Sequence, residues 1–127
     1  MKFTRYPLTM FVLLWIMYPS AVSFAGEADV VAVKASSGKN GTWSFSVTVR
    51  HDDEGWGHYA DRWEVLGPGG EVIGTRVLLH PHVGEQLFTR SLEGVKVPEG
   101  VSEVVVRAHD LVHSYGGKVM EVELNLE

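Results

Sequence analysis

The sequence has 127 residues, of which 16 are acidic, 11 are basic and 45% are hydrophobic, a composition that suits a globular protein. Its net negative charge argues against nucleic acid and anionic membranes as partners, because a surface that binds phosphates needs clustered basic residues. The absence of cysteine excludes disulfides, blue-copper sites and cysteine-based zinc sites.

Residues 1–25 have the pattern of a signal peptide. Two basic residues precede an apolar run at 8–18, and the small residues Ser23 and Ala25 precede the predicted cleavage site. The run has about 11 residues, fewer than the ~20 of a transmembrane helix. We therefore expect a periplasmic or secreted protein in which residues 26–127 form one domain with a formal charge of −7 and no attachment to the membrane.

Seven short strands separated by turn residues are predicted in the rest of the chain. The alternation is clearest at 42–50, where Trp43, Phe45, Val47 and Val49 share one face and His51 extends it. The other strands are expected at 28–35, 58–66, 71–80, 86–92, 101–108 and 118–126.

No segment has the 3.6-residue apolar period of an amphipathic helix. The pattern therefore predicts an all-β fold, a seven-stranded antiparallel sandwich of the immunoglobulin or fibronectin III-like kind. Trp63 on the third strand fits the buried tryptophan of such sandwiches.

Chain reversal at each turn places the loops after alternate strands at the same end of a sandwich. All six histidines lie in or beside three such loops, 51–57, 80–85 and 109–116. The loops of the opposite end contain ordinary turn residues, so function is expected at the histidine-rich end.

Metal binding is the first interpretation of this end. Imidazole binds Cu(II), Zn and Ni, and a nearby carboxylate can orient a ligating ring. His80 and His82 flank a proline, and His109 and His113 are four residues apart in a predicted loop. The sequence favours copper or zinc held by His80, His82, His109 and one of His51 or His58, with His113 as a further candidate.

The acidic residues of the same loops have two interpretations. Asp53, Asp61, Glu85 and Asp110 are expected either to orient a ligating histidine or to brace the loops, for example by pairing with a nearby arginine. Strand parity places His51 and Asp61 on inward faces.

Recognition without a metal is the alternative. Trp56, Tyr59 and Tyr115 lie beside glycines and are suited to an aromatic platform for a glycan, a peptide or a periplasmic protein.

Catalysis is the least favoured interpretation. Asp110, His113 and Ser114 are the residue types of a hydrolase triad, but neighbouring loop residues rarely give its geometry, and the nucleophile pattern Gly-x-Ser-x-Gly is missing. We therefore predict a binding protein and not an enzyme, with an acid–base hydrolase as the alternative.

Three runs in the chain are distinctive: His51-x-Asp53-x-Gly55-Trp56-x-His58-Tyr59-Ala60-Asp61-x-Trp63, Leu79-His80-Pro81-His82-x-x-Glu85-Gln86 and Arg107-Ala108-x-Asp110-x-Val112-His113. In these runs the chain resembles a family of small exported bacterial proteins of unassigned activity. The resemblance covers most of residues 26–127. It implies export and a shared fold, and it assigns no catalytic or binding residue.

Overall fold

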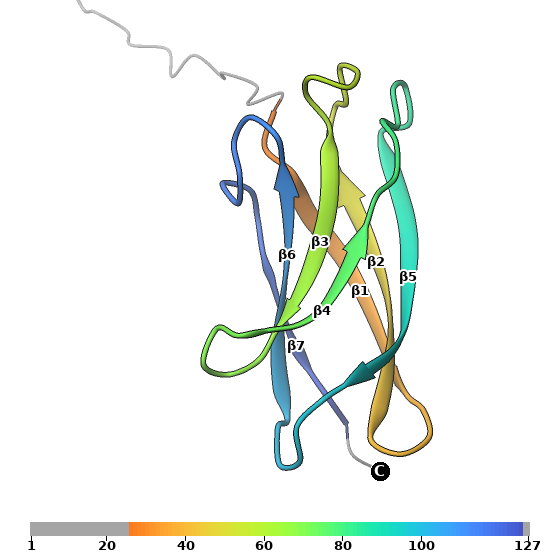
Figure 1. Ribbon diagram of the computed structural model, residues 1–127, viewed down its shortest axis with the longest axis vertical. Coiled ribbons are helices and arrows are strands. Elements are labelled where there is room, and N and C mark those ends of the chain that lie inside the picture. Colours follow the sequence, from red (N-terminus) through yellow and green to blue (C-terminus); the bar gives the residue numbers. More distant parts are fainter. Residues whose placement is uncertain (1–25, 126–127) are drawn as a thin grey trace, which may run out of the picture.

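Seven strands in two sheets face each other in the computed structural model, which describes residues 26–125 (Figure 1). One sheet has the order β1-β2-β5 and the other has the order β4-β3-β6-β7, and all pairings are antiparallel. The strands are β1 (Asp29–Ser37), β2 (Thr42–Arg50), β3 (Ala60–Leu66), β4 (Val72–Val77), β5 (Leu87–Lys96), β6 (Glu103–Asp110) and β7 (Met120–Glu123). The predicted signal peptide lies outside the described residues.

The predicted all-β sandwich is confirmed. The first, second and fifth strands pair as A, B and E do in immunoglobulin domains, and the third, sixth and seventh pair as C, F and G do. The fourth strand pairs with the third, which is the position that variable-type domains call C′. Within residues 26–125, no helix is long and apolar enough to cross a membrane.

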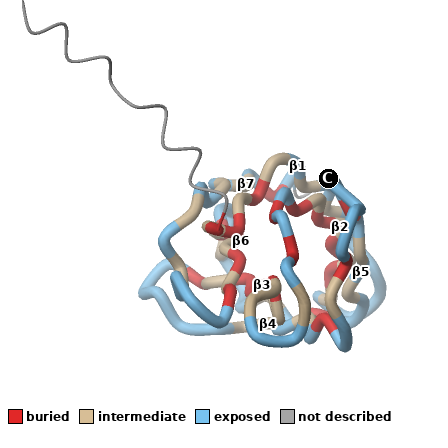
Figure 2. The backbone as a smooth tube through the Cα atoms, turned by 90° about the horizontal axis from the view of Figure 1, so that it is seen from above, coloured by how far each residue is buried: buried red, intermediate tan, exposed pale blue. Residues whose placement is uncertain are grey.

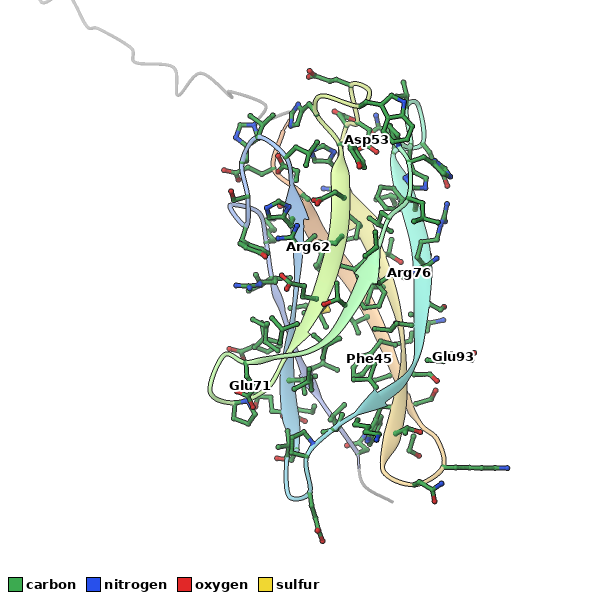
Figure 3. The ribbon with its side chains drawn as sticks, in the orientation of Figure 1. Phe45, Asp53, Arg62, Glu71, Arg76 and Glu93 are labelled. Atoms are coloured by element: carbon green, nitrogen blue, oxygen red, sulfur yellow. The ribbon has the colours of Figure 1, made fainter. Side chains whose placement is uncertain are left out.

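The core fills the space between the sheets, where the buried parts of the backbone line the interior (Figure 2). The alternating residues of β2 are buried as predicted, and Phe45 points between the sheets (Figure 3). Trp63 on β3 is fully buried, at the strand position of the tryptophan in immunoglobulin-like sandwiches. Burying side chains of this size stabilises the fold by about 1.5–3 kcal/mol each.

The fifth strand is longer than predicted. It was expected to end at Leu92, but β5 continues to Lys96. The pairing with β2 shifts by one residue here, and Gly94 has a φ of 70°. Gly94 supplies the positive φ of a β-bulge, so its glycine signal marks an irregularity within a strand and not a chain reversal.

A second bulge corrects the predicted orientation of Asp61. Ala60 pairs with Asp110 and Arg62 pairs with His109, so Asp61 is an extra residue in β3. The bulge moves Asp61 off the inward face that parity had predicted, and its side chain is 18% exposed. The predicted boundary of β6 was also wrong, because this strand includes His109 and Asp110.

Three loops form what we call the upper end of the sandwich: residues 51–59, 78–86 and 111–119 (Figure 1). The turns at 38–41 and 97–102 lie at the lower end. The predicted gathering of all six histidines at one end is therefore confirmed, with His80 and His109 at the same pole.

Candidate metal centre

Two polar residues lie at the upper ends of the inward faces of two core strands, Asp110 within its strand and His51 directly after its strand. His51 follows Val49 on the buried face that runs along β2, and it is 2% exposed. Asp110 follows Ala108 on the buried face of β6 and is fully buried. The apolar core thus ends, at the upper end, in an imidazole from one sheet and a carboxylate from the other.

His58, in the 51–59 loop, completes a group of three. Its Nε2 lies 3.4 Å from Asp110 Oδ1, and the Nε2 of His51 lies 4.0 Å from Asp110 Oδ2. The two imidazole rings meet edge to face with centroids 5.0 Å apart. One possible ligand atom from each of the three residues lies within 4.8 Å of the others, so this group could hold a metal ion.

The opposite nitrogen of each ring faces another carboxylate. His51 Nδ1 pairs with Asp53 Oδ1, and His58 Nδ1 lies 3.5 Å from Glu54 Oε2. Metal-bound histidines usually donate their second ring N–H to such a group, which fixes the ring and directs the other nitrogen to the metal. Both rings are therefore oriented with Nε2 towards Asp110.

Asp110 has one satisfied and one unsatisfied oxygen. Its Oδ1 accepts hydrogen bonds from the backbone N–H groups of Val112 (2.8 Å) and His113 (2.7 Å). Its Oδ2 is buried and has no hydrogen-bond partner within the described residues. Burying a carboxylate oxygen without a hydrogen bond is costly, so a cation beside Oδ2 would relieve an existing penalty.

The main-chain carbonyl of Gly26 lies beside both rings. Its oxygen is 2.8 Å from His51 Nε2 and 3.1 Å from His58 Nε2. A carbonyl only accepts hydrogen bonds, so these nitrogens carry protons in this arrangement. Sequence reasoning missed this contact because a backbone oxygen leaves no residue-type signal, and it also missed Glu54.

Asp53, which lies at the upper end in Figure 3, links the 51–59 loop to the 78–86 loop. Besides His51, it accepts the backbone N–H of Ala60 at 3.0 Å and that of His82 at 2.6 Å. The residue is 5% exposed, so these hydrogen bonds replace the water that its carboxylate loses on folding. Asp53 thus contacts a ring of the candidate centre and also braces two loops.

The groups around His58 change the pKa of its imidazole ring. Burial alone would lower the pKa of His58, but hydrogen bonds to the Gly26 carbonyl and to Glu54, together with the negative charge of Asp110 and Glu54, raise this pKa above its usual value. The site therefore favours positive charge at the position of this ring.

His80 and His82 form a separate pair, so the ligand set favoured from the sequence does not come together. Their ring centroids are 4.7 Å apart. His82 is 6% exposed, stacks on Phe88 and accepts a hydrogen bond from Arg90 Nη2 at 2.9 Å. Burial and the positive charges of Arg90 and His80 lower the pKa of His82, against the opposing effect of Glu85 and Asp53.

His109 also lies apart from the candidate centre. Its Nδ1 is 2.5 Å from Asp61 Oδ1, and Asp61 accepts a hydrogen bond from Arg62 at 2.9 Å. Parity explains the separation, because His109 is adjacent to Asp110 in β6 and so projects from the opposite face of the sheet. His113 is closer, with its ring 5.3 Å from that of His58.

The predicted aromatic platform is divided. Trp56 is 68% exposed and meets Tyr59 edge to face at 5.7 Å. Tyr115 instead packs on the guanidinium group of Arg107 at 3.7 Å and on His109 at 4.8 Å. The side chain of Glu85, a predicted brace, is exposed and forms no ion pair within residues 26–125.

The residues of the suggested triad do not face one another as a triad requires. Asp110 contacts the main-chain nitrogen of His113 and not its ring. Ser114 pairs with Asp110 through the backbone and has a φ of 55°.

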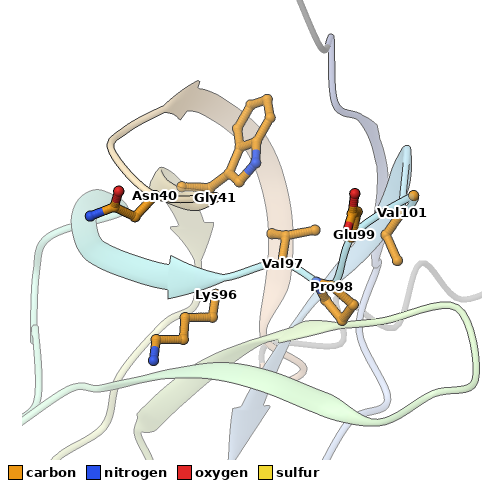
Figure 4. A pocket seen from close by; sticks show the side chains of 9 residues that line it. Asn40, Gly41, Lys96, Val97, Pro98, Glu99 and Val101 are labelled. Atoms are coloured by element: carbon orange, nitrogen blue, oxygen red, sulfur yellow. The ribbon is translucent and has the colours of Figure 1, made fainter.

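A larger cavity lies at the lower end (Figure 4). It has a volume of about 490 Å³ and is lined by Asn40, Gly41, Trp43, Lys96, Val97, Pro98, Glu99, Gly100 and Val101. Its two ionisable residues, Lys96 and Glu99, are not a ligand set for a transition metal. The side chains that could bind a metal are therefore concentrated at the upper end, whereas the larger cavity lies at the lower end.

Comparison with known proteins gives one informative similarity. The chain is 48% identical over 97 residues to a protein named "Putative lipoprotein" from Halomicrobium mukohataei. The match covers 76% of this chain and 47% of that protein, so the chain spans about half the length of the relative. No family model matches the chain. No solved structure matches it either.

Proposed function

We propose that the upper end binds a divalent transition metal ion through His51, His58 and Asp110. The observation that supports this most strongly is the buried Oδ2 of Asp110, which has no hydrogen-bond partner among residues 26–125 and lies 4.0 Å from the Nε2 of a buried imidazole. The carboxylates that orient both rings from behind are a second support. The donor set of two imidazoles and one carboxylate suits Zn(II) and Cu(II).

Binding would exchange protons for the metal. Both Nε2 atoms lie at hydrogen-bonding distance from the Gly26 carbonyl, and each must lose its proton to become a ligand. The ligand atoms, within 4.8 Å of one another, must also draw together to reach the metal–ligand distances of about 2.0–2.2 Å found in zinc sites. We therefore expect proton release when the ion enters.

The direct test is calorimetric titration of the chelator-treated protein with Zn(II) and Cu(II), with Mg(II) as a control for nonspecific charge. We expect one equivalent of Zn(II) or Cu(II) to bind, and the melting temperature to rise, because a ligand of the native state stabilises it. The variant His58→Gln should weaken binding at least tenfold, whereas the matched variant His109→Gln should not. Equal effects of the two substitutions, or no saturable binding, would contradict the proposal.

We also infer that the protein is exported and functions outside the cytoplasm. The signal-peptide pattern of residues 1–25 supports this. So does the name of the relative, which describes a lipoprotein. Mass spectrometry of the protein from the extracytoplasmic fraction tests it, with a mature chain beginning at Gly26 as the expected result.

Recognition of a partner is the second candidate. Trp56 is 68% exposed, and Leu111 and Val112 in another loop of the same end are also exposed. Tryptophan supplies a large contact area at low entropic cost. If this surface binds a partner, Trp56→Ala should remove partner binding and leave metal binding unchanged. Pull-down measures the first effect, and calorimetry measures the second.

A further inference from the structure

A small cavity between the edge strands β4 and β5 has a different chemistry from the metal centre. Its volume is about 80 Å³, and it is lined by Arg76, Val77, Leu78, Leu79, His80, His82 and Arg90. Arg76 lies on β4 towards β5 (Figure 3). In a protein with a net negative charge, two arginines and two histidines here line one cavity without an acidic residue among them.

Neither arginine of this cavity is neutralised. No carboxylate oxygen of residues 26–125 lies within 4.0 Å of Arg76 or Arg90, whereas Arg62 on β3 and Arg107 on β6 pair with acidic side chains. Arg76 Nε is buried and has no hydrogen-bond partner in the described part of the chain. A buried donor without a partner has lost its hydrogen bond to water, and an acceptor in the cavity would replace that bond.

One arginine is held in place by a histidine. Arg90 donates to His82 Nε2 at 2.9 Å and to the carbonyl of Thr89 at 2.8 Å. His82 must be neutral at Nε2 to accept this bond, and its stacking on Phe88 fixes the ring. The guanidinium group of Arg90 is therefore oriented before any ligand arrives, which lowers the entropic cost of binding.

We propose that this cavity binds a small oxyanion, a phosphate or a carboxylate, through Arg76 and Arg90. The planar guanidinium group matches the geometry of both anions. About 10–15 Å³ of such a cavity holds one water molecule, so 80 Å³ has room for a small oxyanion of four or five heavy atoms but not for a nucleotide. The site is separate from His51, His58 and Asp110 and does not depend on a metal.

The test is titration of the chelator-treated protein with inorganic phosphate and with acetate, followed by NMR of the backbone amides, with chloride at equal ionic strength as the control. Saturable shifts centred on residues 76–82 and 88–90 are expected for at least one oxyanion. Arg76→Gln and Arg90→Gln should weaken binding at least tenfold. The matched variant Arg50→Gln, an exposed arginine outside the lining, should change it less than twofold.

Equal losses in all three variants would mean that only overall charge matters, and this would overturn the proposal. Shifts that grow with chloride as they do with phosphate and acetate would also overturn it. If Arg90→Gln fails to fold, Arg90→Lys keeps the charge and removes the planar fork, and unchanged affinity in that variant would contradict the geometry argued above.

A second inference concerns Gly26 and rests on the proposed metal site and on the proposed cleavage after Ala25. Gly26 is buried, and its carbonyl oxygen lies 2.8 Å from His51 Nε2. A Cβ atom at this position would collide with the ring of His113. A glycine therefore lets the chain pass between the imidazoles of two loops.

We infer that cleavage after Ala25 creates a further metal ligand, the α-amino group of Gly26. The amino nitrogen and the carbonyl oxygen of one residue can bind the same ion as a five-membered chelate. The imidazoles of His51 and His58 already flank the carbonyl of this residue.

Three forms of the protein test this inference: a chain beginning at Gly26, the same chain with one additional N-terminal alanine, and the Gly26 form carrying Asp110→Asn. We expect the added alanine to weaken Cu(II) binding at least tenfold, and to change the nitrogen couplings in the electron paramagnetic resonance spectrum. Equal affinity and equal spectra for the first two forms would overturn this inference and leave the metal site intact. Absence of binding in all three would instead remove the proposed function.

Discussion

The two ends of the sandwich use the same strands for different purposes. At the lower end, Trp43, the second residue of β2, lines a cavity of about 490 Å³ whose other lining residues are mostly apolar and turn residues. At the upper end, the same face of β2 leads to His51, which faces the buried carboxylate of Asp110. The difference shows that residues of the stabilising core and residues of the candidate metal centre can lie at opposite ends of one strand. A substitution at the lower end should reduce stability and leave metal affinity unchanged, and a substitution at the upper end should do the reverse.

The largest effect is expected at the lower end. Trp43 is 5% exposed, and Trp43→Ala should lower the free energy of unfolding by about 3–5 kcal/mol, because it removes a large buried side chain and enlarges a cavity. Urea denaturation measures this change. Affinity for Zn(II) in the protein that remains folded should be unaltered, and a parallel loss of affinity would mean that the two ends are coupled.

Asp110→Asn should give the reverse signature. The amide keeps an oxygen for the N–H groups of Val112 and His113 but removes the buried charge, so the metal-free protein should unfold at about the same or a higher urea concentration. Loss of a proposed direct ligand should weaken metal binding by about 100-fold or more, beyond the 10–100-fold of changes behind the ligands. A strongly destabilised apo-protein with normal affinity would show that Asp110 is only a structural brace.

A smaller effect is expected from Glu54, which lies behind His58. Its side chain is 63% exposed, so Glu54→Gln should leave the free energy of unfolding within about 0.5 kcal/mol. Affinity for Zn(II) should fall by up to about tenfold, because the carboxylate orients the ring of His58. Calorimetry on this variant and on Asp52→Asn, a neighbouring acidic residue that bonds to Gln86, separates orientation from general charge.

The smallest effect concerns pH in the metal-free protein. Burial, Arg90 and His80 lower the pKa of His82 below the ordinary 6.5, so the unfolded chain takes up this proton first as the pH falls. His82 should therefore reduce stability progressively below pH 6.5. In the presence of a chelator, His82→Gln should lose less stability than the wild type between pH 7.5 and pH 5.5. An equal or steeper loss in the variant would contradict this sign.

Much of the fold could be predicted because the alternation of apolar and polar residues marks the strands and the turn residues mark where the strands end. The run from Trp43 to Val49 predicted both β2 and the inward direction of His51. The bulges at Asp61 and Gly94 were missed because an extra residue in a strand depends on its pairing partner, which a single sequence does not reveal.

The candidate centre was harder to predict than the end on which it lies. Chain reversal gathered the histidines correctly, but it could not tell which face of a strand or loop each one occupies. His109 and Asp110 are neighbours in β6 and therefore project to opposite faces, a distinction lost when both were assigned to a loop. The contact of His58 with Gly26 depends on loop conformation, which follows no sequence period.

The position of His51 at the end of an alternating face has a consequence for insertions and deletions. Removing one residue within β2 would turn His51 outwards and bring its neighbour into the interior, since side chains alternate at every step. The same holds for Asp110 and β6. Gains and losses of single residues should therefore be tolerated in the lower turns, whereas within these two strands they would abolish the centre even in a chain that still folds.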